Sequence, residues 1–154
     1  MTHRYRATVQ WSGSTGLGYE GYDRAHEATS PPAPTGLALS GDPTFGGDAT
    51  RLNPEQLLLL AAASCQLLSF LAVAARARID VIDYADAAEA VMPDDDPPTR
   101  ITAITLRPRI TLRAGPTEER VHHLIEVAHR ECFIANSLRS EIVIEPTIVV
   151  VAAT

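Results

Sequence analysis

The chain contains no lysine, and this absence bears first on nucleic acids as partners. Its 13 basic residues are all arginines, and 19 acidic residues give the 154-residue chain a net charge of -6. Proteins that bind the phosphate backbone rely on clustered Lys and Arg, which displace counterions from the nucleic acid. We therefore expect no nucleic acid partner.

Cysteine is scarce, because the chain has only Cys65 and Cys132. In a reducing cytosol structural disulfides are rare, since thiol buffers keep cysteines reduced. A lone buried thiol usually only fills space, whereas two thiols on facing helices can form a reversible dithiol/disulfide couple. The pair is therefore a candidate redox centre, and two inert thiols are the alternative.

Long hydrophobic runs and a secretory leader are also lacking. No apolar run reaches the roughly 18 residues that a membrane helix requires. The charged N-terminal residues are not followed by the apolar segment of a signal peptide. We expect the chain to span no membrane and to lie in the cytoplasm. Its length predicts one domain over residues 1–154.

Two-residue alternation of apolar and polar side chains predicts several short strands. The segment 29–51 is rich in Pro, Gly, Ser and Asp, so it is predicted to be a loop that carries one short strand. The strands at 5–11 and 17–26 are expected to form a hairpin, and an exposed turn at 93–98 is expected to join the strands of a second hairpin. The predicted strands are 5–11, 17–26 (after a turn at 12–16), 35–39, 79–92, 101–112, 142–144 and 148–151.

Two segments have helical patterns. Asn53 is a good N-cap and Gln56 completes a capping box, so a helix is predicted from Pro54 to about Arg76. Apolar residues cover all its faces, which predicts burial by protein on every side. A second, amphipathic helix is predicted after Pro116. Its apolar, core-facing stripe consists of Val121, Leu124, Ile125, Ala128 and Cys132. The order of elements predicts an α+β fold, with antiparallel sheets packed on a buried central helix.

Cys65 lies about ten residues into the first helix, beyond the turn where the helix dipole lowers the pKa of a thiol. Burial alone raises that pKa, so a reactive Cys65 requires a cation from elsewhere in the fold, and Arg is the only candidate besides His. Glu55 cannot touch Cys65, because ten helical residues rise about 15 Å and end on a different face. Glu55 is either a first-turn acid or an acid that holds an Arg beside a cysteine of a second subunit.

Three segments carry a recognisable combination of motifs: Asn-Pro-Glu-Gln-Leu at 53–57, Ala-Ala-Ala-Ser-Cys at 61–65 and Cys-Phe-Ile-Ala-Asn-Ser-Leu at 132–138. Together they resemble the OsmC/Ohr family of thiol peroxidases. The resemblance implies an intertwined homodimer in which Cys65 attacks an organic hydroperoxide and Cys132 resolves the sulfenic acid to a disulfide. It implies no bound cofactor, because an external dithiol, often of the lipoyl type, reduces the disulfide.

The resemblance also implies roles for an acid and an arginine. Glu55 matches the family acid that orients a thiolate-activating arginine. Arg24, in Tyr-Asp-Arg-Ala-His at 22–26, resembles a Tyr-x-Arg-x-His stretch of one branch and is our first choice for that arginine. Arg51 is the second choice. The chain departs from the family at Gln66, where an aromatic residue often stands, and at Phe133, where many members have Pro.

Two other functions stay open. His129 lies three residues before Cys132, so these two residues and Cys65 could bind zinc, although no paired-ligand motif is present. A non-enzymatic alternative is a dimer whose dithiol is inert and whose pocket binds an apolar ligand. The candidate walls of a pocket that suits an alkyl or fatty hydroperoxide are Leu67, Leu68, Phe70 and Phe133, and ordinary core packing is the alternative for each.

Overall fold

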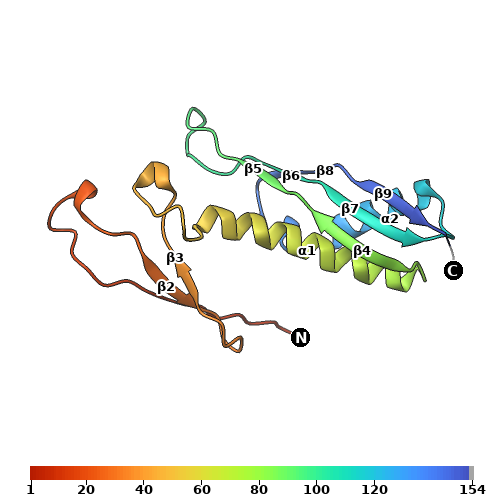
Figure 1. Cartoon of the computed structure of the whole chain (residues 1–154), viewed down its shortest axis with the longest axis horizontal. Helices are drawn as coiled ribbons and strands as arrows, with labels where there is room; N and C mark the ends of the chain where they lie inside the picture. Colours follow the sequence, from red (N-terminus) through yellow and green to blue (C-terminus); the bar gives the residue numbers. More distant parts are fainter. Residues whose placement is uncertain (153–154) are drawn as a thin grey trace. The chain divides into compact units, whose positions relative to one another are not determined.

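The computed structural model describes residues 1–152, and the chain divides into two compact units, 1–58 and 59–154. The boundary falls early in the long helix α1 (Pro54–Arg76). The first unit carries one small sheet, whereas the second carries two more sheets and helix α2 (Glu118–Glu131) (Figure 1). The expectation of a single domain over 1–154 stays a prediction.

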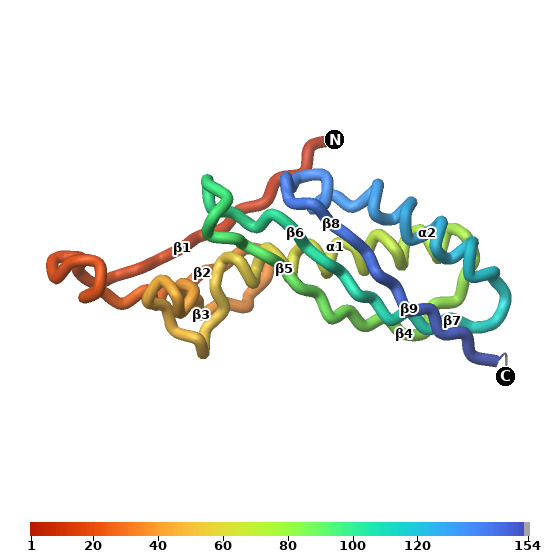
Figure 2. Tube along the Cα trace, turned by 90° about the horizontal axis from the view of Figure 1, so that it is seen from above, coloured from red at the N-terminus to blue at the C-terminus, as the bar shows by residue number. Residues whose placement is uncertain are grey.

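The first unit is built on an antiparallel sheet of β1 (Thr8–Gln10), β2 (His26–Thr29) and β3 (Leu37–Leu39), in the order β1-β2-β3 (Figure 2). The strands predicted at 5–11 and 35–39 are confirmed over part of their lengths. The strand predicted at 17–26 is wrong for most of its length, because this segment contains the 3₁₀ helix η1 (Tyr19–Gly21). Gly18 has a φ of 82°, a left-handed conformation that a strand does not contain.

The segment between β3 and α1 is a compact loop with the 3₁₀ helix η2 (Pro43–Phe45). The N–H of Ser40 donates to the carbonyl of Leu52 (3.0 Å), and the N–H of Asp48 donates to Oγ of Ser40 (3.1 Å). A Cβ at Gly47 would collide with the carbonyl of Gly41, so only glycine fits there. These contacts fix the approach to α1.

Helix α1 begins with the capping box that the sequence predicts. The N–H of Gln56 donates to Oδ1 of Asn53 (2.8 Å), and the N–H of Asn53 donates to Oε1 of Gln56 (3.0 Å). Two backbone donors that the helix cannot satisfy are thereby paired. The predicted helix from Pro54 to about Arg76 is confirmed at both ends.

One face of α1 is buried, and its members are Ala62, Gln66, Phe70, Val73 and Ala74. On the rest of the helix Leu60, Leu68 and Leu71 keep 53%, 63% and 38% of their surface exposed. The prediction of burial on every side is therefore wrong for the described chain. The expectation that no apolar run reaches membrane length is wrong, because α1 is long and apolar enough by length and composition alone, a test that the core helix of a folded protein also passes.

The second unit contains two sheets of three strands, ordered β4-β7-β9 and β5-β6-β8. The strands are β4 (Val81–Asp86), β5 (Glu89–Val91), β6 (Ala103–Leu106), β7 (Pro108–Arg113), β8 (Glu141–Ile144) and β9 (Thr147–Val151). The second hairpin is confirmed, since β5 pairs antiparallel with β6 and β4 with β7. The prediction of antiparallel sheets is confirmed only in part, because β8 and β9 lie parallel to β6 and β7. Helix α2 precedes both late strands and returns the chain so that they run in the same direction as their partners.

The core of the second unit lies between both helices and the sheet β4-β7-β9. Its buried members are Phe70, Val73 and Ala74 of α1, Ile110 and Leu112 of β7, and Val121, Ile125 and Ala128 of α2. Each large apolar side chain buried here contributes about 1.5–3 kcal/mol. The predicted stripe of α2 is confirmed by this packing. Cys132, directly after the helix, is only 1% exposed, so its predicted core position is confirmed as well.

Candidate active site

The two thiols lie in contact within the second unit. Cys65 is in the middle of α1 and is half-buried, whereas Cys132 is the C-cap residue of α2 and is buried. Both are free thiols, and a hydrogen bond joins their side chains. The packing of α1 against α2 therefore brings together two residues that are far apart in the sequence.

The segment that follows α2 folds tightly around Cys132. The N–H of Ala135 donates to the Cys132 sulfur (3.5 Å), and the N–H of Asn136 donates to the Cys132 carbonyl (3.0 Å). The amide of Asn136 also donates to the carbonyl of Arg130 (2.9 Å), and Oγ of Ser137 donates to a preceding carbonyl (2.7 Å). These bonds hold the backbone in one conformation, so its N–H groups are fixed in direction.

The pKa of Cys65 is lower than that of an ordinary thiol. Burial is the largest single influence and raises the pKa. Hydrogen bonds from the backbone N–H of Ile134, the thiol of Cys132 and the N–H of Phe133 lower it. The hydroxyl of Ser69, one turn further along α1, adds another such bond. The donors together outweigh burial, so Cys65 is stabilised as a thiolate.

The pKa of Cys132 shifts in the opposite direction and is higher than that of an ordinary thiol. Burial raises the pKa of Cys132, and the neighbouring charge and hydrogen bond of Cys65 raise it further. The N–H of Ala135 offsets only part of this change. The pair therefore favours a thiolate at Cys65 beside a protonated thiol at Cys132, which is the arrangement that an attacking and a resolving cysteine require.

Within the second unit, backbone N–H groups and a hydroxyl lower the pKa of Cys65, and the activating cation stays a prediction. Ser69, Phe133 and Ile134 were not singled out for this role. A donor at Ser69 could have been found from the sequence, because residues four apart share a helix face. The N–H groups of Phe133 and Ile134 carry no such signal, since they act through tertiary packing.

Arg24 lies in the first unit, where backbone carbonyls and aromatic rings hold its guanidinium. Its Nη1 and Nη2 donate to the carbonyls of Tyr22 and Tyr19, both at 2.6 Å. Its Cζ lies 4.0 Å from the ring centre of Tyr22 and 4.7 Å from that of Tyr19, within cation–π range. Together with Trp11 and His26, Arg24 lines a hollow of about 410 Å³.

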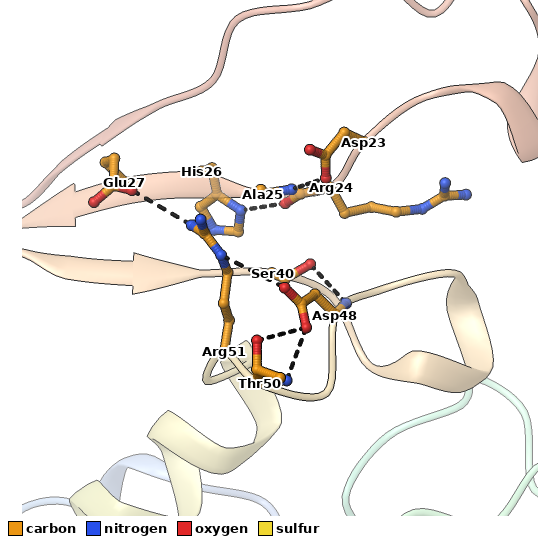
Figure 3. A network of polar contacts seen from close by, with 9 residues as sticks. All are labelled: Asp23, Arg24, Ala25, His26, Glu27, Ser40, Asp48, Thr50 and Arg51. Atoms are coloured by element: carbon orange, nitrogen blue, oxygen red, sulfur yellow. Dashed lines mark hydrogen bonds and ion pairs between the residues drawn. The ribbon is translucent and has the colours of Figure 1, made fainter.

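Arg51, the second choice, is paired with acids. Its Nη1 lies 3.4 Å from Glu27 and its Nε 3.8 Å from Asp48 (Figure 3). Asp48 in turn accepts hydrogen bonds from the N–H and hydroxyl of Thr50, which lower the pKa of its carboxyl. The side chains of Arg24 and Arg51 point in different directions in Figure 3.

Glu55 is half-buried in the first turn of α1. Within residues 1–152 it forms no ion pair, so the structure pairs it with neither Arg24 nor Arg51. All three residues belong to the first unit, whereas both cysteines belong to the second. Their roles beside Cys65 stay predictions.

Other polar groups are buried in the second unit. Gln66 is 1% exposed; its Nε2 reaches the carbonyl of Ile125 at 3.5 Å and its Oε1 has no partner in the described chain. The hydroxyl of Tyr84 is also buried without a partner there. Burial and then the charges of Asp86 and Cys132 raise the pKa of Tyr84. Tyr84 is a neighbour of Cys132 that no sequence motif indicates.

The candidate pocket walls separate into two groups. Phe70 belongs to the core, where its ring lies 6.1 Å from that of Tyr84, so it is not a wall of an open pocket. Phe133 and Leu68 are 80% and 63% exposed.

In the part of the chain that the structure describes, no group of three His, Cys, Asp or Glu side chains is placed to hold a metal, so the zinc arrangement with His129 does not form there.

Comparisons with known proteins give a consistent result. The model of the OsmC-like protein family matches residues 46–147. An OsmC-like protein of unknown function from Vibrio cholerae is 27% identical, with a TM-score of 0.85 over 94% of this chain and 99% of that chain. An organic hydroperoxide resistance protein from Elizabethkingia anophelis is 20% identical, with a TM-score of 0.71 over 97% of each chain. No curated protein sequence is significantly similar to the chain.

A further likeness is to an organic hydroperoxide resistance protein from Legionella pneumophila, 17% identical with a TM-score of 0.68 over 97% of this chain and 98% of that chain. Below a quarter of identical residues such likenesses show the fold alone. The fold is therefore α+β and OsmC-like, and residues 1–152 contain two α-helices and three small sheets. In this fold the long apolar helix α1 is the core helix.

Proposed function

The chain belongs to the OsmC-like family, and we propose that it reduces organic hydroperoxides through Cys65 and Cys132. The observation that carries the proposal is the contact between the two thiols, in which the pKa of Cys65 is lowered and that of Cys132 is raised. Solved proteins of the same fold are named for resistance to organic hydroperoxides, which supports this substrate class.

The proposed reaction begins at Cys65. Its thiolate attacks the terminal oxygen of the hydroperoxide, the O–O bond breaks, and the leaving alkoxide is protonated to the alcohol. Cys65 is then a sulfenic acid. The sulfur of Cys132 attacks the Cys65 sulfur, the S–O bond breaks, and the hydroxide leaves as water with the proton of Cys132. An external dithiol, of the lipoyl type by the family resemblance, reduces the disulfide and is itself oxidised.

In this proposal Arg24 stabilises the thiolate and the developing alkoxide, and Glu55 orients it. We assign this role to Arg24 because its guanidinium has no carboxylate partner within residues 1–152. Arg51, in contrast, contacts both Glu27 and Asp48. A carboxylate partner reduces the charge that an arginine can offer to a thiolate. Arg24 therefore remains the first choice.

The proposal includes a homodimer in a reducing compartment such as the cytoplasm. The exposed leucines of α1, Leu60, Leu68 and Leu71, form an apolar surface that a second copy would cover. A dimer would also allow the first unit of one copy to supply the arginine to the thiols of the other. Equilibrium sedimentation of the full chain tests the dimer directly.

The function is tested by following consumption of tert-butyl hydroperoxide and cumene hydroperoxide with dihydrolipoamide as the reductant. The parent chain should turn over, Cys65→Ser should lose all activity, and Cys132→Ser should stop after one equivalent of peroxide. The matched control is Ser64→Ala, which changes an exposed neighbour of Cys65. An inactive parent chain that behaves like Cys65→Ser would contradict the proposal.

A specific observation favours one alternative, the binding of an apolar ligand. Val9, Trp11 and Tyr22 line the hollow of about 410 Å³ in the first unit, whose lining is mainly apolar. That volume lies within the range of small-molecule sites. Quenching of the single Trp11 by a fatty acid, in a chain that consumes no hydroperoxide, would support this function over the peroxidase.

A further inference from the structure

A hollow of about 660 Å³ lies in the second unit, and three arginines line it. Arg78 follows the end of α1, Arg113 ends β7 and Arg120 lies in the first turn of α2. Neither cysteine lines this hollow, so it is separate from the thiol pair. The end of α1 and the connection from β7 to α2 therefore bring guanidinium groups to one place that has no part in the proposed peroxidase reaction.

The hollow has an excess of positive charge. Asp80 is its only acidic lining residue, and its Oδ2 lies 2.9 Å from Nε of Arg113. Arg78 and Arg120 have no ion pair within residues 1–152, so three guanidinium groups face a single carboxylate. Glu118 lies in the same turn as Arg120, but its Oε1 is 3.6 Å from Nε2 of His122 and it does not line the hollow. This local excess occurs on a chain whose net charge is -6.

The backbone at Arg78 is an unusual place for a long side chain. The N–H of Ile79 donates to the carbonyl of Ala74 (2.9 Å) and that of Arg78 to Ala75 (3.0 Å), the two bonds of a Schellman motif. Arg78 occupies the left-handed position of this motif, with a φ of 59°. Glycine is the usual residue there, because a Cβ introduces strain. Arg78 therefore places a guanidinium at a backbone position that glycine would occupy with less strain.

We propose that this hollow binds a small organic anion with two or more phosphate or carboxylate groups. Guanidinium groups bind both kinds of group through paired, charge-assisted hydrogen bonds. The volume is within the range of small-molecule sites and exceeds what one inorganic phosphate fills. Arg113 is paired with Asp80, and Arg78 and Arg120 provide two charges without an ion pair in residues 1–152.

The proposal is tested by isothermal titration calorimetry of the full chain with pyrophosphate and, separately, with citrate. We expect binding that saturates at one anion per chain and weakens when salt is raised to about 0.15 M. Arg78→Gly and Arg120→Gln should each weaken binding about tenfold or more. Arg109→Gln is the matched control, because Arg109 is an exposed arginine of β7 outside the hollow.

Arg78→Gly guards against a loss of binding through misfolding, since glycine relieves the strain at this position and the variant should unfold at the same or a higher temperature. Absence of saturable binding of both anions by the parent chain would overturn the proposal. Equal weakening by Arg109→Gln would also overturn it, because the effect would then follow net charge alone. Cys65→Ser should bind normally, so the result is independent of whether the chain is a peroxidase.

Discussion

The sulfur of Cys65, in the middle of α1, accepts a hydrogen bond from the backbone N–H of Ile134, in the segment that follows α2. The packing of two helices on one core thus places a fixed donor against the thiol whose pKa is lowered. Ser137 and Asn136 hold the backbone of this segment through hydrogen bonds to earlier carbonyls. Because the donor belongs to the backbone, it should survive any side-chain substitution that preserves this packing.

Alkylation should distinguish the two thiols by pH. Iodoacetamide reacts with thiolates, so Cys65 should reach half of its maximal rate at a pH below about 8.5, the ordinary thiol value, and Cys132 at a pH above it. A pKa that is lowered in the folded state favours the thiolate there. Its contribution to stability is present above the unfolded pKa and is lost as the pH falls through the folded pKa.

The measurement uses Cys132→Ser to observe Cys65 alone and Cys65→Ser to observe Cys132 alone, with mass spectrometry of the alkylated chain. Serine keeps a donor at each position, so the hydrogen bond between the two side chains is not simply deleted. Identical pH profiles, or a lower midpoint for Cys132, would contradict the assignment of Cys65 as the attacking thiol.

Ser69→Ala should raise the pKa of Cys65, because it removes one of the donors to the thiolate. One lost bond to a half-buried charge should lower the thiolate fraction at neutral pH, and with it the rate of oxidation by cumene hydroperoxide, about two- to tenfold. Ser64→Ala, on the exposed side of the same helix, is the control and should change neither. Stopped-flow measurement at a pH below the pKa of Cys65 in the parent chain compares the oxidation rates of the two variants. Equal rates for Ser69→Ala and Ser64→Ala would show that Ser69 has no part in the site.

Arg24→Gln should slow oxidation by cumene hydroperoxide more than Arg51→Gln does. In the proposed site Arg24 offers its charge to the thiolate, whereas Arg51 contacts Glu27 and Asp48. We expect a loss of about a hundredfold in kcat/KM for Arg24→Gln, comparable to removal of one group that stabilises developing charge. Arg51→Gln should cost less than about 1 kcal/mol in stability, because both of its ion pairs are long and partly exposed. The reverse order of effects would transfer the role to Arg51.

Local interactions in this chain could be predicted from the sequence, and tertiary ones could not. The capping box between Asn53 and Gln56 joins residues three apart, so the sequence contains all of its parts. The burial of Cys132 follows from the helical spacing of one stripe. The donors to Cys65 depend instead on how α2 ends against α1, and alternation within a strand does not specify whether β8 runs parallel to its neighbour.

The exposed side of α1 illustrates the same limit. Leu60, Leu68 and Leu71 are as apolar as the residues that form the core, so the sequence predicts burial for all of them. Only the fold shows which face the second unit packs against. In the proposed function, a second copy of the chain covers the other face.

Asn53→Ala should lower the free energy of unfolding by about 1–2 kcal/mol, because it removes the side-chain acceptor for the N–H of Gln56. Gln56→Ala removes the reciprocal bond. The two bonds form one capping box, so the double variant should lose less than the sum of the single losses. Urea unfolding of the four chains measures this coupling, and strict additivity would show that the bonds act independently.

Gln66 should be replaceable by an apolar residue with a gain in stability. Its side chain is 1% exposed, its Nε2 makes one long bond to Ile125, and its Oε1 has no partner in the described chain. A buried polar group without a partner costs about 1–3 kcal/mol, and Met has a similar shape without that cost. Gln66→Met should therefore raise the free energy of unfolding by about 1 kcal/mol in urea titrations. Gln66→Glu places a charge at the same buried site and should lower the free energy of unfolding. A loss of stability in Gln66→Met would mean that the buried oxygen has a partner such as an ordered water.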